Sequence, residues 1–138
     1  MQKITPFLWF DDRAEEAMEF YVSIFPNSKV GKITRYPEGT QDKTGRPAGS
    51  VMVAEFHLAG QDFIALNGGP MFKFTEAVSF SIDCDSQEEI DHYWNALTGD
   101  GGEESMCGWL KDKFGLSWQV NPKVFNQLME KGTPEQTA

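Results

Sequence analysis

The sequence predicts an α+β fold built from two similar modules, each with the order strand, helix and three strands. The chain has 138 residues, which suits one domain or two small modules packed together. Residues 12–24 and 85–97 repeat one pattern, in which Glu15 matches Glu88 at an offset of 73 (88 minus 15). Strand-like segments precede and follow each copy.

Residues 12–24 are expected to form the first helix. Asp12 and Glu15 have the spacing of a capping box, and Pro26 prevents the helix from continuing. Apolar residues recur at three- and four-residue steps, as on one face of a helix. These residues are Ala14, Ala17, Met18, Tyr21, Ile24 and Phe25.

Residues 85–97 are expected to form the second helix in the same way. Ser86 and Glu89 have the capping-box spacing, and the glycines of 99–102 end the helix. Its apolar stripe consists of Ile90, Tyr93, Trp94 and Leu97.

Strands are expected on both sides of each helix, because runs of apolar and β-branched residues lie between Gly- and Pro-containing segments. A turn of the pattern D-x-x-G, from Asp112 to Gly115, separates the last two strands. The expected strands are residues 4–10, 28–36, 49–60 and 61–67 in the first module, and 78–84, a short stretch near 103–106, 107–111 and 116–121 in the second.

The end of the chain is expected to carry a short C-terminal helix. Asn121 and Pro122 suit a helix start, and Val124, Phe125 and Leu128 would dock on the sheet. We therefore expect one domain over residues 1–132, built of repeats at about 1–70 and 71–122, and a frayed tail over 133–138.

Alternation along the strands predicts which side chains lie under the helices. We assign the large apolar set to this covered face: Phe7, Trp9, Ile64, Leu66, Val78, Phe80, Ile82, Trp118 and Val120. The opposite set is small and polar: Leu8, Phe63, Ala65, Asn67, Ala77, Ser79, Ser81, Ser117 and Gln119. Buried hydroxyls and amides without partners cost about 1–3 kcal/mol each, which favours a ligand cavity over a dry core. A plain solvated sheet face is the alternative.

In residues 51–59 alternation places Glu55 and His57 on the strand face away from the core. The residues on the core-facing side of the same strand are Met52, Ala54, Phe56 and Leu58. In an apolar cleft the pKa of Glu55 would rise, so that it becomes a candidate acid or base. A solvated strand face is the simpler interpretation for both residues.

Composition excludes several classes of function. The formal charge of -9 disfavours nucleic acid and anionic membranes as partners, because both require clustered Lys and Arg. No apolar run reaches the length of a membrane span and no signal peptide is evident, so we expect a cytoplasmic protein. Cys84 and Cys107 lack the spacing of a zinc or redox motif and are expected to be free thiols.

The motifs resemble one family. PFLWFDDRAEEAMEFYVSIFPNSKV, VAEFHLAGQDFIALNGGP, AVSFSIDCDSQEEIDHYW and CGWLKDKFGLSWQV are similar to the PhnB-like branch of the glyoxalase/bleomycin resistance, or vicinal oxygen chelate, superfamily over residues 6–122. Members often carry the label 3-demethylubiquinone-9 3-methyltransferase domain. The resemblance implies paired βαβββ modules that form a curved mixed sheet around a cleft, and a homodimer.

The resemblance also places four metal-ligand positions, which fall on Pro6, Ala65, Ala77 and Gln119. Three of these side chains cannot bind a metal, and one neutral amide does not hold a divalent cation. His57 and His92 do not supply the missing ligands. We therefore expect no metal and no cofactor.

The methyltransferase label meets an obstacle in the sequence. Common adenosylmethionine enzymes need a Gly-rich turn after the first strand, whereas here that strand leads into Asp11 and Asp12. The Gly cluster at residues 67–70 reads as a turn.

The leading hypothesis is a small-molecule binding protein without the usual metal ligands. Asn67, Ser79, Ser81 and Gln119 would bond the ligand, and Leu8, Phe63 and Trp109 would form an apolar wall. Phe72 and Phe74 are candidates for a lid. The alternatives are an enzyme of unknown reaction that uses Glu55 or a recruited metal, the methyltransferase, and a structural or partner-binding role.

Overall fold

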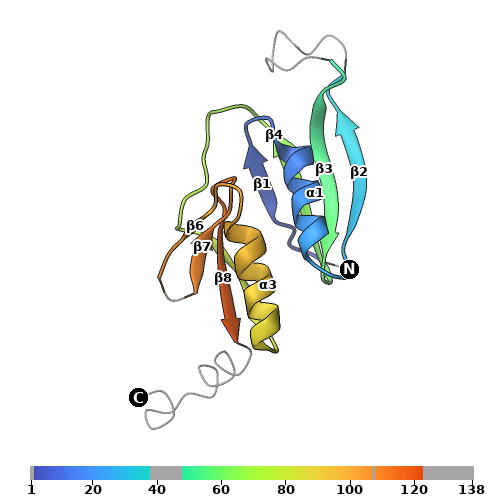
Figure 1. Ribbon diagram of the computed structural model, residues 1–138. Helices are drawn as coiled ribbons and strands as arrows, with labels where there is room; N and C mark the ends of the chain where they lie inside the picture. The colour runs from blue at the N-terminus through green and yellow to red at the C-terminus, as the bar shows by residue number, and fades with distance from the viewer. Residues whose placement is uncertain (1, 38–47, 107, 123–138) are drawn as a thin grey trace. The chain divides into compact units, whose positions relative to one another are not determined.

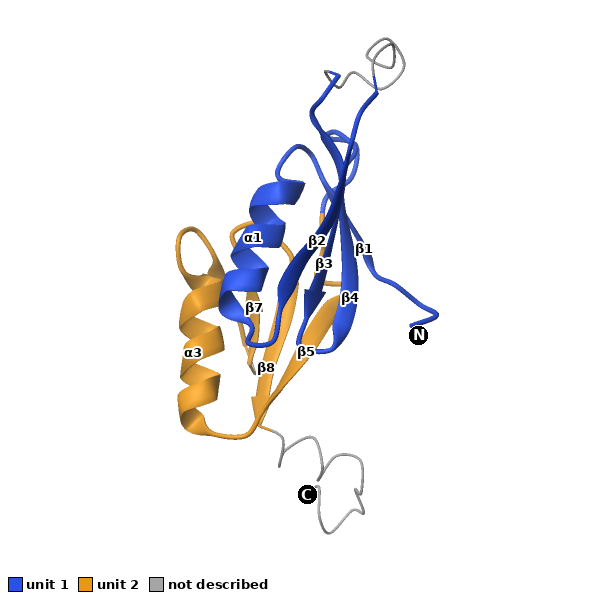
Figure 2. Cartoon of the chain, turned by 90° about the vertical axis from the view of Figure 1, so that its right-hand side faces the viewer, with its two compact units in different colours: residues 1–73 blue, residues 74–138 orange. Residues whose placement is uncertain are grey.

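The structure is a computed structural model that describes residues 2–37, 48–106 and 108–122. The chain divides into two compact units, unit 1 over Met1–Lys73 and unit 2 over Phe74–Ala138 (Figure 2). Cys107, the predicted C-terminal helix and the predicted tail lie outside the described residues. The cleft between the two modules stays a prediction.

Unit 1 has the predicted order of one strand, one helix and three strands (Figure 1). The strands form a mixed sheet in the order β1-β4-β3-β2, in which β1 runs parallel to β4 and the other neighbours are antiparallel. Helix α1 packs against the sheet, mostly on β3 and β4. The elements are β1 (Phe7–Phe10), α1 (Ala14–Ile24), β2 (Lys29–Arg35), β3 (Val51–Leu58) and β4 (Gln61–Asn67).

Unit 2 repeats this topology. Its sheet has the order β5-β8-β7-β6, again with one parallel pair, β5 with β8. Helix α3 packs against β8, β7 and β5. The elements are β5 (Ser79–Cys84), α3 (Gln87–Thr98), β6 (Glu103–Glu104), β7 (Trp109–Lys111) and β8 (Ser117–Pro122). The identical strand order in both units confirms the repeated βαβββ modules predicted from the helices.

The core of unit 1 lies between α1 and the sheet. The ring of Tyr21 stacks on Phe56 with 6.2 Å between centroids, and Phe56 stacks on Phe63 at 5.5 Å. Leu8 and Ala65 pair across β1 and β4 and are also buried. The covered face of unit 1 is therefore the one that carries Leu8, Phe63 and Ala65.

The prediction for the strand faces of unit 1 was wrong for this reason. Phe7 is 59% exposed, and alternation places Trp9 with it on the face away from α1. Ile64 and Leu66 lie on that same open face of β4, because their neighbours Phe63 and Ala65 are the buried ones.

A one-residue difference between the modules explains the error. The first helical residues, Ala14 and Gln87, are 73 apart (87 minus 14), but the last covered strand residues, Phe10 and Cys84, are 74 apart (84 minus 10). The link from β1 to α1 is thus one residue longer than that from β5 to α3. A shift of one residue turns every strand side chain to the other face.

The faces of unit 2 follow the prediction, apart from its first residue. Phe80 contacts Trp118 at 5.6 Å between ring centroids, and Trp118 and Val120 are buried on the side of α3. Val78 was assigned to the covered face wrongly, since it precedes β5 and is 62% exposed.

The two helices begin differently. At α3 the predicted cap is confirmed, because Ser86 Oγ accepts the Glu89 backbone N–H at 3.1 Å. The predicted Asp12–Glu15 capping box is wrong, since Arg13 occupies the cap position of α1 and its side chain bonds Glu16 instead of capping the helix. The Ala14 backbone N–H is instead bonded by the Oδ1 of Asn67 from β4, at 2.8 Å.

Cys84 lies in the core of unit 2, and its thiol is expected to react slowly with alkylating reagents. Burial, with smaller effects from the carboxylates of Glu89, Asp83 and Asp85, raises its pKa to about 11. Relative to a cysteine with the ordinary pKa of 9.0, its thiolate fraction at pH 8 is then roughly 90-fold lower, and burial of the sulfur slows attack further. Alkylation of the folded Cys107→Ser variant, read by mass spectrometry, should be at least 100-fold slower than in urea. A rate within tenfold would contradict this burial.

Candidate functional site

The open face of unit 2, defined as the sheet face away from α3, carries most of the predicted polar residues. Ser79 and Ser81 come from β5, Gln119 from β8 and Trp109 from β7. Ser81 and Trp109 both pair with Gln119 in the strand register. The structure therefore brings four of the predicted ligand-binding residues together on one surface.

A ladder of hydrogen bonds joins these side chains. Gln119 Nε2 donates to Ser79 Oγ at 3.0 Å, and Asn121 Nδ2 donates to Ser81 Oγ at 3.1 Å. Asn121 Nδ2 also approaches Gln119 Oε1 at 3.4 Å. Asn121 was predicted to start a helix and had no predicted ligand role, although alternation from Gln119 places it on this face.

The direction of these bonds determines what the ladder offers to a ligand. Both serine oxygens and the Gln119 carbonyl oxygen act as acceptors within the ladder. The hydroxyl protons of Ser79 and Ser81 are not used in these bonds. The open face of unit 2 thus presents hydrogen-bond donors.

The D-x-x-G turn positions the strand that holds Gln119. Asp112 is 2% exposed, and its Oδ1 accepts the backbone N–H groups of Phe114 at 2.9 Å and Leu116 at 3.1 Å. Its Oδ2 accepts the indole N–H of Trp118 at 2.8 Å. Gly115 takes a positive φ of 90°, which glycine adopts without strain. One buried carboxylate therefore fixes the turn and the start of β8.

Lys111 lies in the same row as Ser79, at one end of the ladder, and is held by acidic groups. Its Nζ forms an ion pair with Glu76 at 2.5 Å, and Lys111 pairs with Glu103 in the register of β6 and β7. The hydrogen bond and charge of Lys111 lower the pKa of Glu76, and those of Glu76 raise the pKa of Lys111.

Ser117 completes that row. It pairs with Ser79 on one side and Lys111 on the other, and alternation places its side chain on the face of Gln119. It is 1% exposed, and its Oγ has no hydrogen-bond partner within the part of the chain that the structure describes.

Three predicted ligand-binding residues lie elsewhere. Leu8, Phe63 and Asn67 are buried under α1 in unit 1, which corrects the face assigned to them. Asn67 uses its amide within the unit, because Oδ1 bonds Ala14 and Nδ2 donates to the Val51 carbonyl oxygen at 3.0 Å. A polar residue in a strand was thus part of a helix cap.

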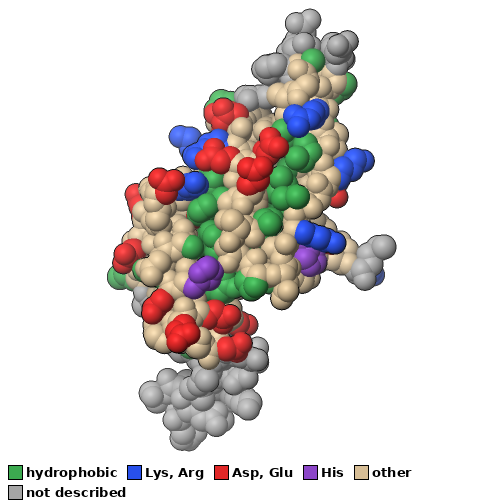
Figure 3. Space-filling model, turned by 45° about the vertical axis from the view of Figure 1, so that its right-hand side comes forward, with side chains coloured by type: hydrophobic (Ala, Val, Ile, Leu, Met, Phe, Trp, Pro, Cys, Tyr) green, Lys and Arg blue, Asp and Glu red, His purple; other side chains and the backbone are tan. Residues whose placement is uncertain are grey.

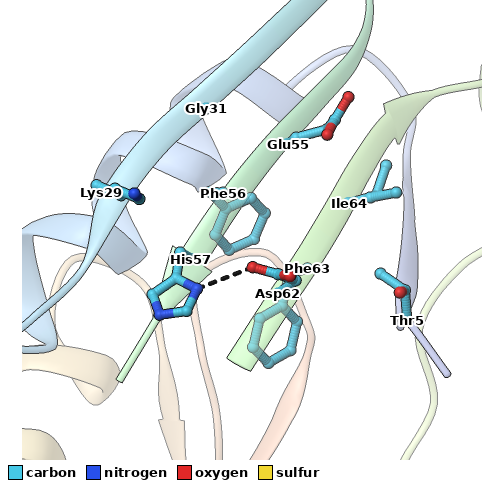
Figure 4. A pocket seen from close by; sticks show the side chains of 9 residues that line it. All are labelled: Thr5, Lys29, Gly31, Glu55, Phe56, His57, Asp62, Phe63 and Ile64. Atoms are coloured by element: carbon cyan, nitrogen blue, oxygen red, sulfur yellow. Dashed lines mark hydrogen bonds and ion pairs between the residues drawn. The ribbon is translucent and has the colours of Figure 1, made fainter. Parts of the chain in front are cut away.

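Unit 1 has a pocket of about 230 Å³ on its own open face, which is the face away from α1 (Figure 4). Strands β2, β3 and β4 line it with, among others, Lys29, Gly31, Glu55, His57 and Asp62. The register of β2 shifts between Val30 and Ile33, opposite Glu55. A Cβ on Gly31 would lie 2.8 Å from the Glu55 carbonyl oxygen, so only glycine fits at this bulge.

His57 closes the hairpin between β3 and β4. Its Nδ1 lies 2.8 Å from Asp62 Oδ1, and its Nε2 accepts the Gly60 backbone N–H at 3.2 Å. Ala59 and Gly60 both have positive φ, as in tight hairpin turns. Both ring nitrogens are therefore used by the turn, and neither is directed to a ligand.

Glu55 points into the pocket from β3 and is exposed (Figure 4). The apolar enclosure on which a role as acid or base depends does not surround it among the described residues. Phe72, named as a lid candidate, packs edge-on against Trp9 at 4.9 Å between ring centroids.

Two of the four positions that the family resemblance assigned to metal ligands, Ala65 and Gln119, lie on different faces of their sheets. Ala65 is buried under α1, whereas Ile64 pairs with Phe7 as Gln119 pairs with Ser81. Ile64 is thus the counterpart of Gln119, and its side chain has no ligand atom. Within residues 2–37, 48–106 and 108–122 no group of three or more His, Cys, Asp or Glu is arranged to hold a metal ion.

The comparisons with known proteins agree with this fold. The family model described as 3-demethylubiquinone-9 3-methyltransferase matches residues 2–121. The chain belongs to this family. A putative 3-demethylubiquinone-9 3-methyltransferase, PhnB protein, from Bacillus cereus is 38% identical, with a TM-score of 0.77, over 88% of this chain and 99% of that one.

More distant structures share the fold. A fosfomycin resistance protein from Listeria monocytogenes is 16% identical with a TM-score of 0.58, over 100% of this chain and 98% of that one. A glyoxalase/bleomycin resistance protein from Albidiferax ferrireducens is 14% identical with a TM-score of 0.55, over 88% and 98%. The fold is therefore that of the vicinal oxygen chelate superfamily. No curated protein matches the chain, and none of the described helices is long and apolar enough to cross a membrane.

Proposed function

We propose that this member of the 3-demethylubiquinone-9 3-methyltransferase family binds a small organic molecule on the open face of unit 2. The observation that carries the proposal is the ladder of Ser79, Gln119, Ser81 and Asn121, which does not use the hydroxyl protons of the two serines. Trp109, half-buried beside Gln119, supplies an aromatic wall.

A plain solvated sheet face explains these features less well. A solvated face does not need its polar side chains to bond one another, because water satisfies each of them. Here two amides and two hydroxyls are ordered by mutual bonds, and Ser117 beside them is buried with no partner for its Oγ among the described residues. Ordering such side chains costs conformational entropy, and preorganisation of a binding surface offsets that cost.

NMR titration of the ¹⁵N-labelled full chain tests the proposal. Small aromatic fragments with different head groups are added singly, and shifts of the backbone and side-chain amides locate the contact. We expect at least one fragment to move the signals of Ser79, Ser81 and Gln119 together in a saturable way. Fragments that move signals elsewhere but leave these three unchanged would contradict it.

A pair of variants separates binding from loss of structure. Gln119→Ala is expected to lower the affinity of the bound fragment at least fivefold, because it removes the bond to Ser79 and unties the ladder. Gln87→Ala is the matched control, since Gln87 is an exposed glutamine of α3 in the same unit. Equal affinity for both variants would sink the proposal.

The family description favours methyl transfer as a second candidate function. Against it, β1 leads through residues 11–13 into α1 without a Gly-rich turn. Isothermal titration with S-adenosylmethionine separates the two candidates: micromolar affinity would favour the methyltransferase, and no heat of binding is expected for a binding protein. A cytoplasmic location and a homodimer stay predictions.

A further inference from the structure

We infer that the open face of unit 2 selects an uncharged ligand that presents a carbonyl or ether oxygen to Ser79 and Ser81. The inference rests on the proposed function and narrows its ligand class. It follows from which hydrogen-bonding groups the ladder has already used and from the charges at its ends.

The ladder uses both serine oxygens as acceptors and keeps both serine hydroxyl protons as donors. The carbonyl oxygen of Gln119 and the oxygens of both serines accept bonds from amide N–H groups within it. Each serine hydroxyl that accepts in this way retains its own proton for a further bond. A ligand that brings acceptor oxygens can therefore bond both protons, whereas a ligand that brings only donors leaves these protons unbonded.

Ser117 is a separate observation that indicates an acceptor. Its Oγ has no partner among the described residues, although the side chain is 1% exposed and lies in the row of Ser79. A buried hydroxyl without a partner costs about 1–3 kcal/mol. A ligand oxygen held beside Ser79 would remove that cost once the atoms that cover Ser117 Oγ move aside.

The charges around the ladder disfavour an anion. Lys111, the cation in the row of Ser117, is paired with Glu76 at 2.5 Å and faces Glu103 across β6 and β7. At the other end Asp83 pairs with Asn121 in the register. The chain as a whole carries a formal charge of -9, and Figure 3 shows acidic side chains spread over the drawn face. A carboxylate or phosphate would meet this field without a cation to neutralise it.

The negative electrostatic field of these carboxylates does not by itself make a cation the better ligand. An ammonium group has no lone pair, so it cannot accept the Ser79 and Ser81 hydroxyl protons and can bond only to the acceptor lone pairs that the ladder leaves. Three probes that share a phenyl ring therefore separate the classes: acetophenone is an uncharged acceptor, benzoate an anion and benzylamine a cation.

The test is NMR titration of the full chain with each probe at pH 7 and constant ionic strength. Acetophenone is expected to bind at the Ser79, Ser81 and Gln119 signals at least tenfold more tightly than benzoate or benzylamine. Ser79→Ala and Ser81→Ala should each weaken it at least threefold, whereas Ser23→Ala, at an exposed helical serine of unit 1, should not. Glu76→Gln should raise the affinity of benzoate at least threefold, because it releases Lys111.

The outcomes separate the inference from the proposed function. If benzoate or benzylamine binds these signals as tightly as acetophenone, the selection of an uncharged acceptor is wrong while the ligand face stands. If acetophenone binds there but neither serine variant weakens it, the assignment of the hydroxyl donors is wrong. If no probe moves these signals, the inference and the proposed function both fail.

Discussion

Asp112→Ala is expected to lower the free energy of unfolding by about 3 kcal/mol. The carboxylate accepts three hydrogen bonds while 2% exposed, so its loss leaves two backbone N–H groups and the Trp118 indole without their acceptor. Bonds to a charged acceptor contribute about 1.5–3 kcal/mol each, less the cost of burying the charge. Urea denaturation measures the change.

Two further variants make this prediction specific. Asp112→Asn should cost less, because one side-chain oxygen can still bond Phe114 and Leu116 while the amide group faces the Trp118 N–H. Asp91→Ala, at an exposed position of α3, should change the stability by less than about 0.5 kcal/mol. The NMR signal of the Trp118 indole should move in both Asp112 variants. A stable Asp112→Ala protein with an unmoved indole signal would mean that the carboxylate does not hold the turn.

Asn67→Ala is expected to lower the free energy of unfolding by about 2.5 kcal/mol. The buried amide bonds the first N–H of α1 and the Val51 carbonyl oxygen, and alanine satisfies neither. Because Asn67 acts as the cap that Arg13 does not provide, α1 should lose protection at its first turn. Hydrogen exchange at Ala14 and urea denaturation report the two effects.

Asn95→Ala is the matched control for Asn67, since Asn95 is an exposed asparagine on α3. It should leave the stability within about 0.5 kcal/mol. Asn67→Asp distinguishes the two bonds, because a carboxylate still accepts from Ala14 but cannot donate to Val51. If Asn67→Ala lowers the affinity for a ligand but leaves the free energy of unfolding unchanged, Asn67 contacts the ligand as first predicted. That result would contradict its structural role.

The elements of the fold could be predicted from the sequence because their local signals agree. The stripe of Ala14, Ala17 and Tyr21 has helical spacing, and these residues are buried as expected. Ser86 caps α3 as its spacing with Glu89 indicates. The repeat then predicted the common order of both units, since two similar sequences fold into similar modules.

The covered face of unit 1 could not be found this way, because both faces of β1 are apolar. Phe7 and Trp9 are as large as Leu8 and Phe10, so hydrophobicity does not choose between them. The choice is made by the length of the link to α1, which is one residue longer than its counterpart in unit 2. Side-chain pattern fixes a strand's face only where the two faces differ in polarity.

The same limit decided which candidate site residues were assigned to the correct face. Ser79, Ser81 and Gln119 were identified because β5 and β8 alternate clearly between polar and apolar residues. Asn67 was misassigned because a polar residue near a strand end can equally serve a helix cap, and only the Ala14 contact distinguishes these roles. Asn121 was missed since Pro122 suggested a helix start, whereas β8 continues through it.

The two open faces have diverged chemically although the modules repeat. Ile64 in unit 1 stands where Gln119 stands in unit 2, and Phe7 stands where Ser81 stands. Unit 1 therefore offers apolar surface at the positions where unit 2 offers hydrogen-bond donors. This divergence favours unit 2 as the part that recognises the polar group of a ligand.

A crystal structure of the full chain with bound acetophenone tests the central claim most directly. The account predicts that the carbonyl oxygen lies within about 3.2 Å of Ser79 Oγ or Ser81 Oγ, with the phenyl ring near Trp109. Acetophenone bound only in the pocket of unit 1 beside Glu55, or a ladder whose serine hydroxyls bond nothing but water, would contradict it.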